Sequence, residues 1–367
     1  MAEEQALQQI LEQFDCPGSV EECIPYGQGH INNTYRIVCR KDGKAKYYIL
    51  QSINGNVFKE PEKVMENIEN VTAWLKKKIR ENGGDEKRET LNLVRTKDGG
   101  SCYFDSDKTC WRMYYFIRDA VSFEQVKSAE DFYQSAVAFG HFQRLLADYP
   151  ADTLHETIAD FHNTQDRFRK FKEVLERDPC GRAADAAEEI QFVLEREELA
   201  GALCRLQAEG KLPLRVTHND TKLNNVMFDR ETGAPICIVD LDTVMPGLSV
   251  NDFGDSIRFG ASTAAEDEKD LSKVSCDLEL YEAYVKGFIE GCEGALTEAE
   301  LDNLPLGAVM MTFECGMRFL TDHLDEDHYF KIHREGHNLD RCRTQFKLVK
   351  DMEGKMEQMK AIVDRYR

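Results

Sequence analysis

The sequence predicts an α+β fold in two lobes, with a small β-rich N-terminal lobe and a larger, mainly helical C-terminal lobe. Strand-like runs punctuated by glycine fill residues 18–57, whereas apolar residues from Ala129 onward recur at three- and four-residue spacing. The β-rich sequence gives way to helical sequence near residues 116–119. We therefore expect one lobe over residues 1–117 and the other over residues 118–367.

In the N-terminal lobe, residues 1–15 predict an acidic amphipathic helix. A second helix is expected over residues 61–80, because Val64, Ile68, Val71 and Leu75 fall on one face. A turn is expected within residues 40–46. Short strands follow at residues 91–95, 101–104 and 111–116.

In the C-terminal lobe, a helix beginning near Ala129 has a buried face marked by Phe132, Ala136, Phe139 and Phe142. Further helices are expected over residues 164–177, 184–209, 267–290, 298–322 and 340–365. Two short strands, 225–228 and 236–239, interrupt this helical sequence around a polar turn.

Composition excludes several classes of protein. The formal net charge of −20 over 367 residues argues against nucleic acid or an anionic membrane as partner, since both need basic faces. There is no run of about 18 apolar residues and no secretory signal pattern, so we expect a cytoplasmic protein, most simply a monomer. The twelve cysteines contain no Cys-x-x-Cys pair and predict reduced core thiols.

The most informative segment runs from Val216 to Thr243. An apolar strand leads into a loop with Asp220 and, five residues later, Asn225, and a second strand ends at Asp240. Kinases use this order of residues to place a catalytic base and two magnesium ligands. The segment predicts a phosphotransferase, and the two lobes then predict a protein-kinase-like fold.

Each residue of the segment has an expected role. Asp220 accepts the proton of the acceptor hydroxyl, and the oxygens of Asn225 and Asp240 bind Mg²⁺, a hard cation that takes few protein ligands. Lys222 directs a positive charge toward the transferred phosphoryl group, and His218 organises the loop backbone. Any one of these residues alone would more simply be a turn former.

Two acids downstream, Asp252 and Asp255, are expected to bind main-chain N–H groups or an arginine and so hold the loop in place. Both follow the second strand closely in sequence.

The nucleotide site is predicted from weaker patterns. Gly27 and Gly29 can let the backbone turn closely over phosphates, although a hairpin without a ligand explains them nearly as well. The backbone of residues 113–117, with Tyr115 and Ile117, is expected to meet the adenine of ATP. A plain core strand fits its aromatic content equally well.

Gln51 occupies the strand position at which protein kinases carry a phosphate-binding lysine. Glu69, in the middle of the next helix, is its candidate partner, with a solvated helix face as the alternative. Because this lysine is missing, Lys222 is expected to supply part of the positive charge.

Several segments resemble the aminoglycoside phosphotransferase and choline kinase superfamily, and within it the N-acetylhexosamine 1-kinases. The resemblance is carried by residues 26–35, 48–51, 215–225, 253–263 and 314–320. It implies phosphorylation of the anomeric C1 hydroxyl of N-acetylglucosamine or N-acetylgalactosamine, with ATP and Mg²⁺ as cofactors and a small-molecule sugar as partner.

The acceptor site is predicted with alternatives. His30 and Asn32 can reach an acceptor group or merely stabilise a turn. Phe259 and Tyr329 can cover a sugar face or belong to the core. The resemblance places Arg318 in the acceptor pocket, where a fork of donors binds sugar oxygens. The alternative is an ion pair with Glu314, one helical turn earlier.

Other functions remain open on sequence alone. An acidic chain would also attract a cationic acceptor such as an aminoglycoside or choline. A choline site usually has an aromatic cage, and both tryptophans, Trp74 and Trp111, lie in the predicted ATP-binding lobe, which argues against choline. A plain hexose is a further acceptor. A nucleotide-binding pseudokinase is disfavoured because Asp220, Asn225 and Asp240 are all present.

Overall fold

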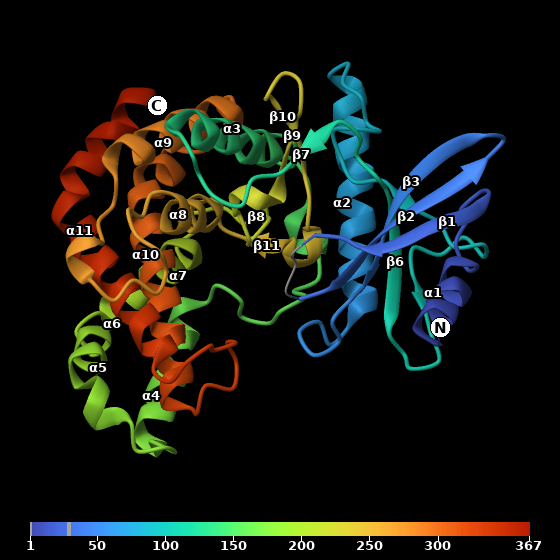
Figure 1. Cartoon of the computed structure of the whole chain (residues 1–367). Coiled ribbons are helices and arrows are strands. Elements are labelled where there is room, and N and C mark those ends of the chain that lie inside the picture. The colour runs from blue at the N-terminus through green and yellow to red at the C-terminus, as the bar shows by residue number, and fades with distance from the viewer. Residues whose placement is uncertain (1, 28–30) are drawn as a thin grey trace. The chain divides into compact units, whose positions relative to one another are not determined.

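The computed structural model describes residues 2–27 and 31–367, with side chains from residue 5 onward. The chain divides into two compact units, each described by itself below (Figure 1). The N-terminal unit consists of Met1–Val121, Asp152–Ala159 and Met227–Met245. The C-terminal unit consists of Ser122–Ala151, Asp160–Val226 and Pro246–Arg367. The predicted β-rich N-terminal and helical C-terminal parts are confirmed.

A six-stranded sheet forms the centre of the N-terminal unit, in the order β1-β2-β3-β6-β4 with β5 on β6. Its neighbouring strands are antiparallel. Asp42 and Gly43, both at positive φ, turn the chain from β2 to β3, inside the predicted turn. The strands are β1 (Ser19–Pro25), β2 (Asn33–Lys41), β3 (Lys44–Ser52), β4 (Leu93–Val94), β5 (Tyr103–Phe104) and β6 (Cys110–Tyr115).

The two faces of this sheet differ in character because side chains alternate along a strand. On one face, Leu50 and Met113 pack with Ile10 and Leu11 of helix α1 (Ala2–Leu11) in an apolar core. The opposite face carries polar side chains from the same strands, Gln51 of β3 and Arg112 of β6, which are cross-strand partners.

Helix α2 (Pro61–Glu81) confirms the predicted second helix, with proline in its first turn and an apolar buried face. Figure 1 shows it alongside the sheet. Asn67 on its buried face donates a hydrogen bond of 3.0 Å to the carbonyl of Val244. A three-stranded sheet, β10-β9-β7, completes the unit, with β7 (Ala120–Val121), β9 (Val226–Asp229) and β10 (Pro235–Ile238), followed by the 3₁₀ turn η4 (Leu241–Thr243).

The C-terminal unit is a bundle in which α3 packs on α9, and α10 packs on α8 and α11. Glycines permit the first contact, since a Cβ on Gly140 would lie 2.4 Å from the carbonyl oxygen of Phe288. The long helices are α3 (Ala129–Leu145), α4 (Thr164–Arg177), α8 (Ser249–Gly260), α9 (Leu278–Cys292), α10 (Glu298–Leu324) and α11 (His337–Tyr366). The remaining regular elements are η1 (Ala151–Thr153), β8 (Arg215–Thr217), η3 (Leu223–Asn225), β11 (Met245–Gly247) and η5 (Leu271–Lys273).

Helices α3, α4, α10 and α11 confirm predictions, whereas two predicted helices were wrong in extent. The single helix expected over residues 184–209 is four pieces: η2 (Ala183–Ala186), α5 (Ala187–Leu194), α6 (Glu197–Ala200) and α7 (Ala202–Ala208). Arg196 and Gly201 lie at its junctions, and glycine favours a helix end. The helix expected from residue 267 begins at Leu278 instead, because the Asp277 carboxylate caps the N–H groups of Glu279 and Leu280.

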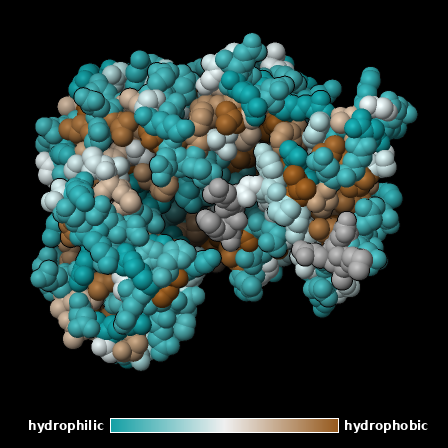
Figure 2. Space-filling model, in the orientation of Figure 1, coloured by the Kyte–Doolittle hydropathy of each residue, from teal (hydrophilic) through white to brown (hydrophobic). Residues whose placement is uncertain are grey.

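The visible surface is largely polar. The face seen in Figure 2 is mainly hydrophilic, with apolar residues in small separate groups. Among the described residues, none of the helices combines the length and the apolar character needed to cross a membrane.

Candidate active site

The loop after β8, residues 218–225, is called the catalytic loop below. It brings together three of the predicted residues of the C-terminal unit. The Nζ of Lys222 lies 2.8 Å from Oδ1 of Asp220. The side-chain amide of Asn225 donates to the main-chain oxygen of Asp220 at 2.8 Å and to its Oδ2 at 3.2 Å. Because Asn225 uses its nitrogen for these bonds, its side-chain oxygen is left for another donor or a cation.

Asp252 in the first turn of α8 anchors the start of this loop. Its carboxylate accepts hydrogen bonds of 2.8 Å from the main-chain N–H groups of both His218 and Asn219, and one of 2.9 Å from Gln143. Burial raises the pKa of Asp252, although these main-chain bonds oppose the shift. Asn219 has φ +63°, a left-handed conformation that lets two successive N–H groups converge on one carboxylate.

Asp255, one turn later on α8, anchors the middle of the loop. It accepts from the main-chain N–H of Thr221 at 3.1 Å and pairs with Arg258 at 3.1 Å. Burial alone would raise the pKa of Asp255, but Arg258 and Lys222 lower it. The expectation that Asp252 and Asp255 hold the loop through main-chain N–H groups and an arginine is confirmed.

Lys222 lies within electrostatic range of both Asp220 and Asp255. Burial opposes its charged form, but the two carboxylates raise the pKa of Lys222 above its usual value. The ammonium group is therefore retained at neutral and mildly alkaline pH, beside the predicted base.

His218 is fully buried, with the edges of its ring against Phe139 at 5.6 Å and Phe142 at 6.1 Å between centroids. Its Nδ1 lies 3.3 Å from the main-chain nitrogen of Asp220, which donates to it. The ring therefore contacts the backbone of the loop, as an organising residue should.

Asp240 belongs to the N-terminal unit, where it follows β10 in a left-handed conformation with φ +59° and an exposed side chain. Two residues later, Asp242 is buried and lies 2.5 Å from a guanidinium nitrogen of Arg112. The backbone next to Asp240 is thus fixed at Asp242 by a buried ion pair.

Arg112 is the main feature of the site that sequence reasoning missed. Its side chain is 1% exposed, and it donates two hydrogen bonds, of 3.0 and 2.9 Å, to the side-chain oxygen of Gln51. Burial disfavours its charge, but Asp242 raises the pKa of Arg112. A lone arginine within the aromatic run of residues 111–115 was a signal, because a buried charge needs a partner.

One predicted interaction of the N-terminal unit was wrong, and the alternative of a solvated helix face for Glu69 fits the structure. Glu69 does not meet Gln51. It forms an ion pair with Arg95 on the surface of α2, while the amide nitrogen of Gln51 donates to Thr34 at 3.0 Å. The partner of the strand residue is the arginine of the adjacent strand, because the cross-strand register places it directly opposite.

Asn32 is engaged on both sides of its amide. It donates to Oδ2 of Asp242 at 2.6 Å and accepts the main-chain N–H of Asn54 at 3.0 Å. These bonds match the turn-stabilising alternative, and an acceptor contact by Asn32 stays a prediction.

The structure describes some of the other residues that were predicted to bind the nucleotide. Gly27 has φ +78°, and a Cβ added to it would meet no atom within 4 Å, whereas Gly29 and His30 lie outside the described residues. The main-chain N–H of Tyr115 donates to Asn92. That of Ile117 has no main-chain acceptor within residues 2–27 and 31–367, and its contact with adenine stays a prediction.

A cluster around Arg318, called the acceptor cluster, lies in the C-terminal unit. It comprises Phe161, Arg167, Arg318, Tyr329 and Phe330. The guanidinium carbon of Arg318 lies 5.3 to 5.7 Å from the ring centroids of Phe161, Tyr329 and Phe330. Burial and the charge of Arg318 lower the pKa of Arg167.

The predicted alternative for Arg318, an ion pair with Glu314, was wrong. Glu314 pairs instead with His162 at 2.9 Å and accepts from Thr164 at 2.6 Å. Within the described part of the chain, Arg318 has no carboxylate within 4.0 Å, and its one hydrogen bond is a long contact of 3.4 Å with the hydroxyl of Tyr329. Phe259 is 40% exposed near the end of α8, outside this cluster.

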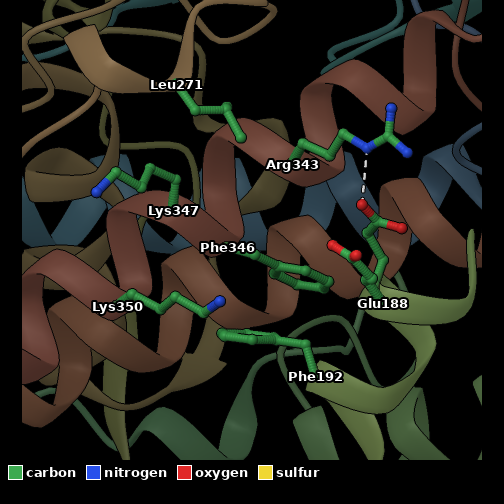
Figure 3. Close-up of a pocket in the computed structure, with 8 residues that line it drawn as sticks. Glu188, Phe192, Leu271, Arg343, Phe346, Lys347 and Lys350 are labelled. Carbon is green, nitrogen blue, oxygen red and sulfur yellow. Dashed lines mark hydrogen bonds and ion pairs between the residues drawn. The ribbon is translucent and has the colours of Figure 1, made fainter.

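A hollow among α5, η5 and α11 is separate from all of these residues (Figure 3). Phe192 and Phe346 stack on its floor at 4.4 Å, and Arg343 pairs with Glu189 at its wall. Its volume of about 130 Å³ is well below the roughly 300 Å³ of common ligand pockets.

Comparison with known protein families bears on the segment that contains the catalytic loop. Residues 117–284 match the phosphotransferase enzyme family. The matched segment is similar to the phosphotransferases of this family. It includes Asp220, Asn225 and Asp240 together with the anchoring acids of α8.

Several solved structures share the fold across nearly the whole chain. An aminoglycoside phosphotransferase from Alicyclobacillus acidocaldarius is 11% identical, covering 98% of this chain and 96% of its own, with a TM-score of 0.61. A choline kinase from Cryptosporidium parvum is 10% identical, covering 94% and 92%, with a TM-score of 0.57. A spectinomycin phosphotransferase, solved with ADP and spectinomycin, is 13% identical, covering 96% and 98%, also at 0.57. The kinase-like fold is therefore established.

Proposed function

We propose that this phosphotransferase uses ATP and Mg²⁺ to phosphorylate the anomeric C1 hydroxyl of an N-acetylhexosamine. The observation that carries the transfer chemistry is the cluster of Asp220, Lys222 and Asn225, held by Asp252 and Asp255. Six hydrogen-bonding or ionic contacts fix this loop, and the proposed chemistry depends on position and charge more than on covalent steps.

In this mechanism, a carboxylate oxygen of Asp220 takes the proton of the attacking hydroxyl. The new bond joins that hydroxyl oxygen to the γ-phosphorus, and the bond from the γ-phosphorus to the bridging oxygen breaks, releasing ADP. Lys222 places its positive charge beside the base, where the transferred group carries its negative charge. The loop thus positions proton acceptor and cation together before substrate arrives.

The donor set fits magnesium. Asn225 uses its side-chain nitrogen for hydrogen bonds and keeps its oxygen for a cation, and the carboxylate of Asp240 would be the second ligand. Two oxygen ligands from the protein are a normal complement, because phosphate and water provide the others. When bound, the ion would neutralise charge on the nucleotide phosphates.

The acceptor cluster favours an oxygen-rich, uncharged acceptor. Arg318 and Arg167 lie together and neither has a carboxylate within 4.0 Å among the described residues, so this cluster would repel a cation. A guanidinium fork flanked by aromatic rings suits sugar hydroxyls, an amide oxygen or a product phosphate.

A cationic acceptor such as an aminoglycoside or choline is the second candidate. The net charge of −20 favours it through long-range attraction. The two arginines of the acceptor cluster oppose it at short range, where the interaction is stronger, and we rank the sugar first.

Phosphorus NMR of a reaction panel tests the proposal. Mg-ATP is incubated with N-acetylglucosamine, N-acetylgalactosamine, glucose, choline and an aminoglycoside in separate tubes. We expect a new phosphate doublet coupled to the anomeric proton with the N-acetylated sugars. A product phosphate on another position, or transfer to choline or the aminoglycoside alone, contradicts the C1 assignment.

A further inference from the structure

His162 and Glu314 form a buried pair in the C-terminal unit that the transfer chemistry above does not use. The side chain of Glu314 is 2% exposed and that of His162 is 12% exposed. Nδ1 of His162 lies 2.9 Å from Oε1 of Glu314, and the hydroxyl of Thr164 donates to the other carboxylate oxygen at 2.6 Å.

This pairing sets the tautomer of the imidazole. Burial alone would raise the pKa of Glu314, but His162, Arg318 and Thr164 lower it, so the carboxylate is ionised at neutral pH. An ionised carboxylate only accepts hydrogen bonds, and Nδ1 must therefore be the donor. In the neutral ring, Nε2 is then left as a hydrogen-bond acceptor.

That acceptor atom has no partner in the protein. Nε2 of His162 is buried and forms no hydrogen bond with any described residue. A buried polar atom without a partner is uncommon and costs stability, so it marks a place where a ligand or water completes the bonding.

The free atom lies beside the acceptor cluster. The ring of Phe161 is 4.5 Å from that of His162 and 5.7 Å from the guanidinium carbon of Arg318. Arg318 also lies one turn from Glu314 on α10 and contributes to its lowered pKa. An acceptor nitrogen and a set of N–H donors therefore flank the same aromatic ring.

The same pair lies close to the loop that contains Asp220. His162 is within electrostatic range of Asp252 and Asp255, the two carboxylates that hold that loop. A ligand group bound at His162 would thus be near the segment that carries Asp220.

We propose that His162 and Arg318 form a two-point site for a secondary amide on the acceptor molecule. Nε2 of His162 accepts the amide N–H, and the guanidinium of Arg318 donates to the amide carbonyl oxygen. Glu314 is the positioning residue, because it fixes the ring orientation and keeps the proton on Nδ1. The inference rests on the proposed function and assigns recognition of the acetamido group to these residues.

The site distinguishes an N-acetylated sugar from its parent hexose. A hydroxyl in place of the acetamido group is too short to meet both residues, and a site built for such bonds discriminates against an analogue that lacks them. His162→Phe keeps an aromatic ring against Phe161 and removes the acceptor atom. We expect the ratio of kcat/KM for N-acetylglucosamine to that for glucose to fall roughly tenfold, the usual effect of one hydrogen bond, mainly through the KM of the N-acetylated sugar.

The control is His155→Phe, the same change at another imidazole paired with a glutamate, Glu66, in the N-terminal unit. It should leave the ratio unchanged. Glu314→Gln is the second variant, since a carboxamide can donate to Nδ1 and turn Nε2 into a donor, and it should reduce the same ratio while preserving shape. It keeps the test valid if His162→Phe does not fold. An equal fall in kcat/KM for both sugars overturns the amide site. An unaltered ratio of the two kcat/KM values in folded variants overturns it as well.

Binding measured without turnover separates this inference from the proposed function. Saturation-transfer NMR compares N-acetylglucosamine with glucose on the wild-type protein. Preferential binding of the N-acetylated sugar that is lost in His162→Phe supports the amide site even if no sugar phosphate forms. Equal binding of both sugars by the wild type overturns it, even if both are phosphorylated at C1.

Discussion

Arg112 donates both of its hydrogen bonds to one side-chain oxygen of Gln51, at 3.0 and 2.9 Å, and so a neutral residue orients a buried cation. The other side of the guanidinium faces Asp242 at 2.5 Å. The N-terminal unit thus contains a fixed positive charge whose orientation depends on two neighbouring residues.

Replacing Arg112 by methionine should destabilise the protein by about 3–5 kcal/mol, because Asp242 is left buried without its counter-ion. Adding Asp242→Asn should recover part of this loss, since the double variant contains no unpaired charge. Urea unfolding measures the free energy of unfolding of the single and the double variant. Arg118→Met, at an exposed arginine, is the control. A double variant less stable than the single variant contradicts the ion-pair account.

Asp220→Asn should reduce kcat by about 100- to 10,000-fold while the melting temperature changes little. The amide keeps the shape of the side chain but cannot take the hydroxyl proton. Asp107→Asn, at an exposed position of the N-terminal unit, is the matched control. Turnover close to that of the wild type would remove Asp220 from the role of base.

Lys222→Met should lower kcat more than it raises the KM for ATP, because its charge lies beside Asp220 and acts on the group in transfer. Steady-state kinetics with varied ATP separates the two parameters. The opposite pattern, a raised KM with kcat preserved, assigns Lys222 to binding of the nucleotide ground state.

Asp255→Asn should lower the free energy of unfolding by about 1–3 kcal/mol at pH 7, through weaker bonds to Thr221 and Arg258. The folded protein lowers the pKa of Asp255, so its ionised form contributes fully above the ordinary aspartate value of about 3.9. This contribution is lost as the pH falls through the lowered pKa. The difference between variant and wild type should therefore shrink below about pH 4, and a difference independent of pH contradicts it.

Arg318→Ala should raise the KM for the sugar without a large change in melting temperature, because Glu314 has other partners. Calorimetry and sugar kinetics are measured on the same preparation. Arg177→Ala, at an exposed ion pair of α4, is the control. A large fall in melting temperature with sugar affinity preserved assigns Arg318 to the fold.

Local sequence was sufficient for the fold class and for the proximity of Asp220 to Asn225. The helices of residues 61–80 and 298–322 were found because their apolar periodicity and end signals agree. Asp220 and Asn225 were found because five residues of one short loop place them together. Both features depend on neighbours in the chain.

Contacts between distant segments could not be read in the same way. Arg112 meets Gln51 and Asp242 only after the strands have taken their register, and single-sequence patterns do not specify register. Glu314 appeared to suit Arg318 by helical spacing, yet His162, 152 positions earlier, occupies its carboxylate. A charged residue in an apolar run indicates that it needs a partner, but the identity of that partner depends on how distant segments pack.

The identity of residue 51 also determines how this protein responds to reagents. Reagents that acylate amines react with lysine, whereas the carboxamide of Gln51 cannot be acylated in this way. Arg112, the cross-strand partner of Gln51, is buried and permanently protonated, so it is equally inert. An amine-directed label would therefore leave both residues unmodified.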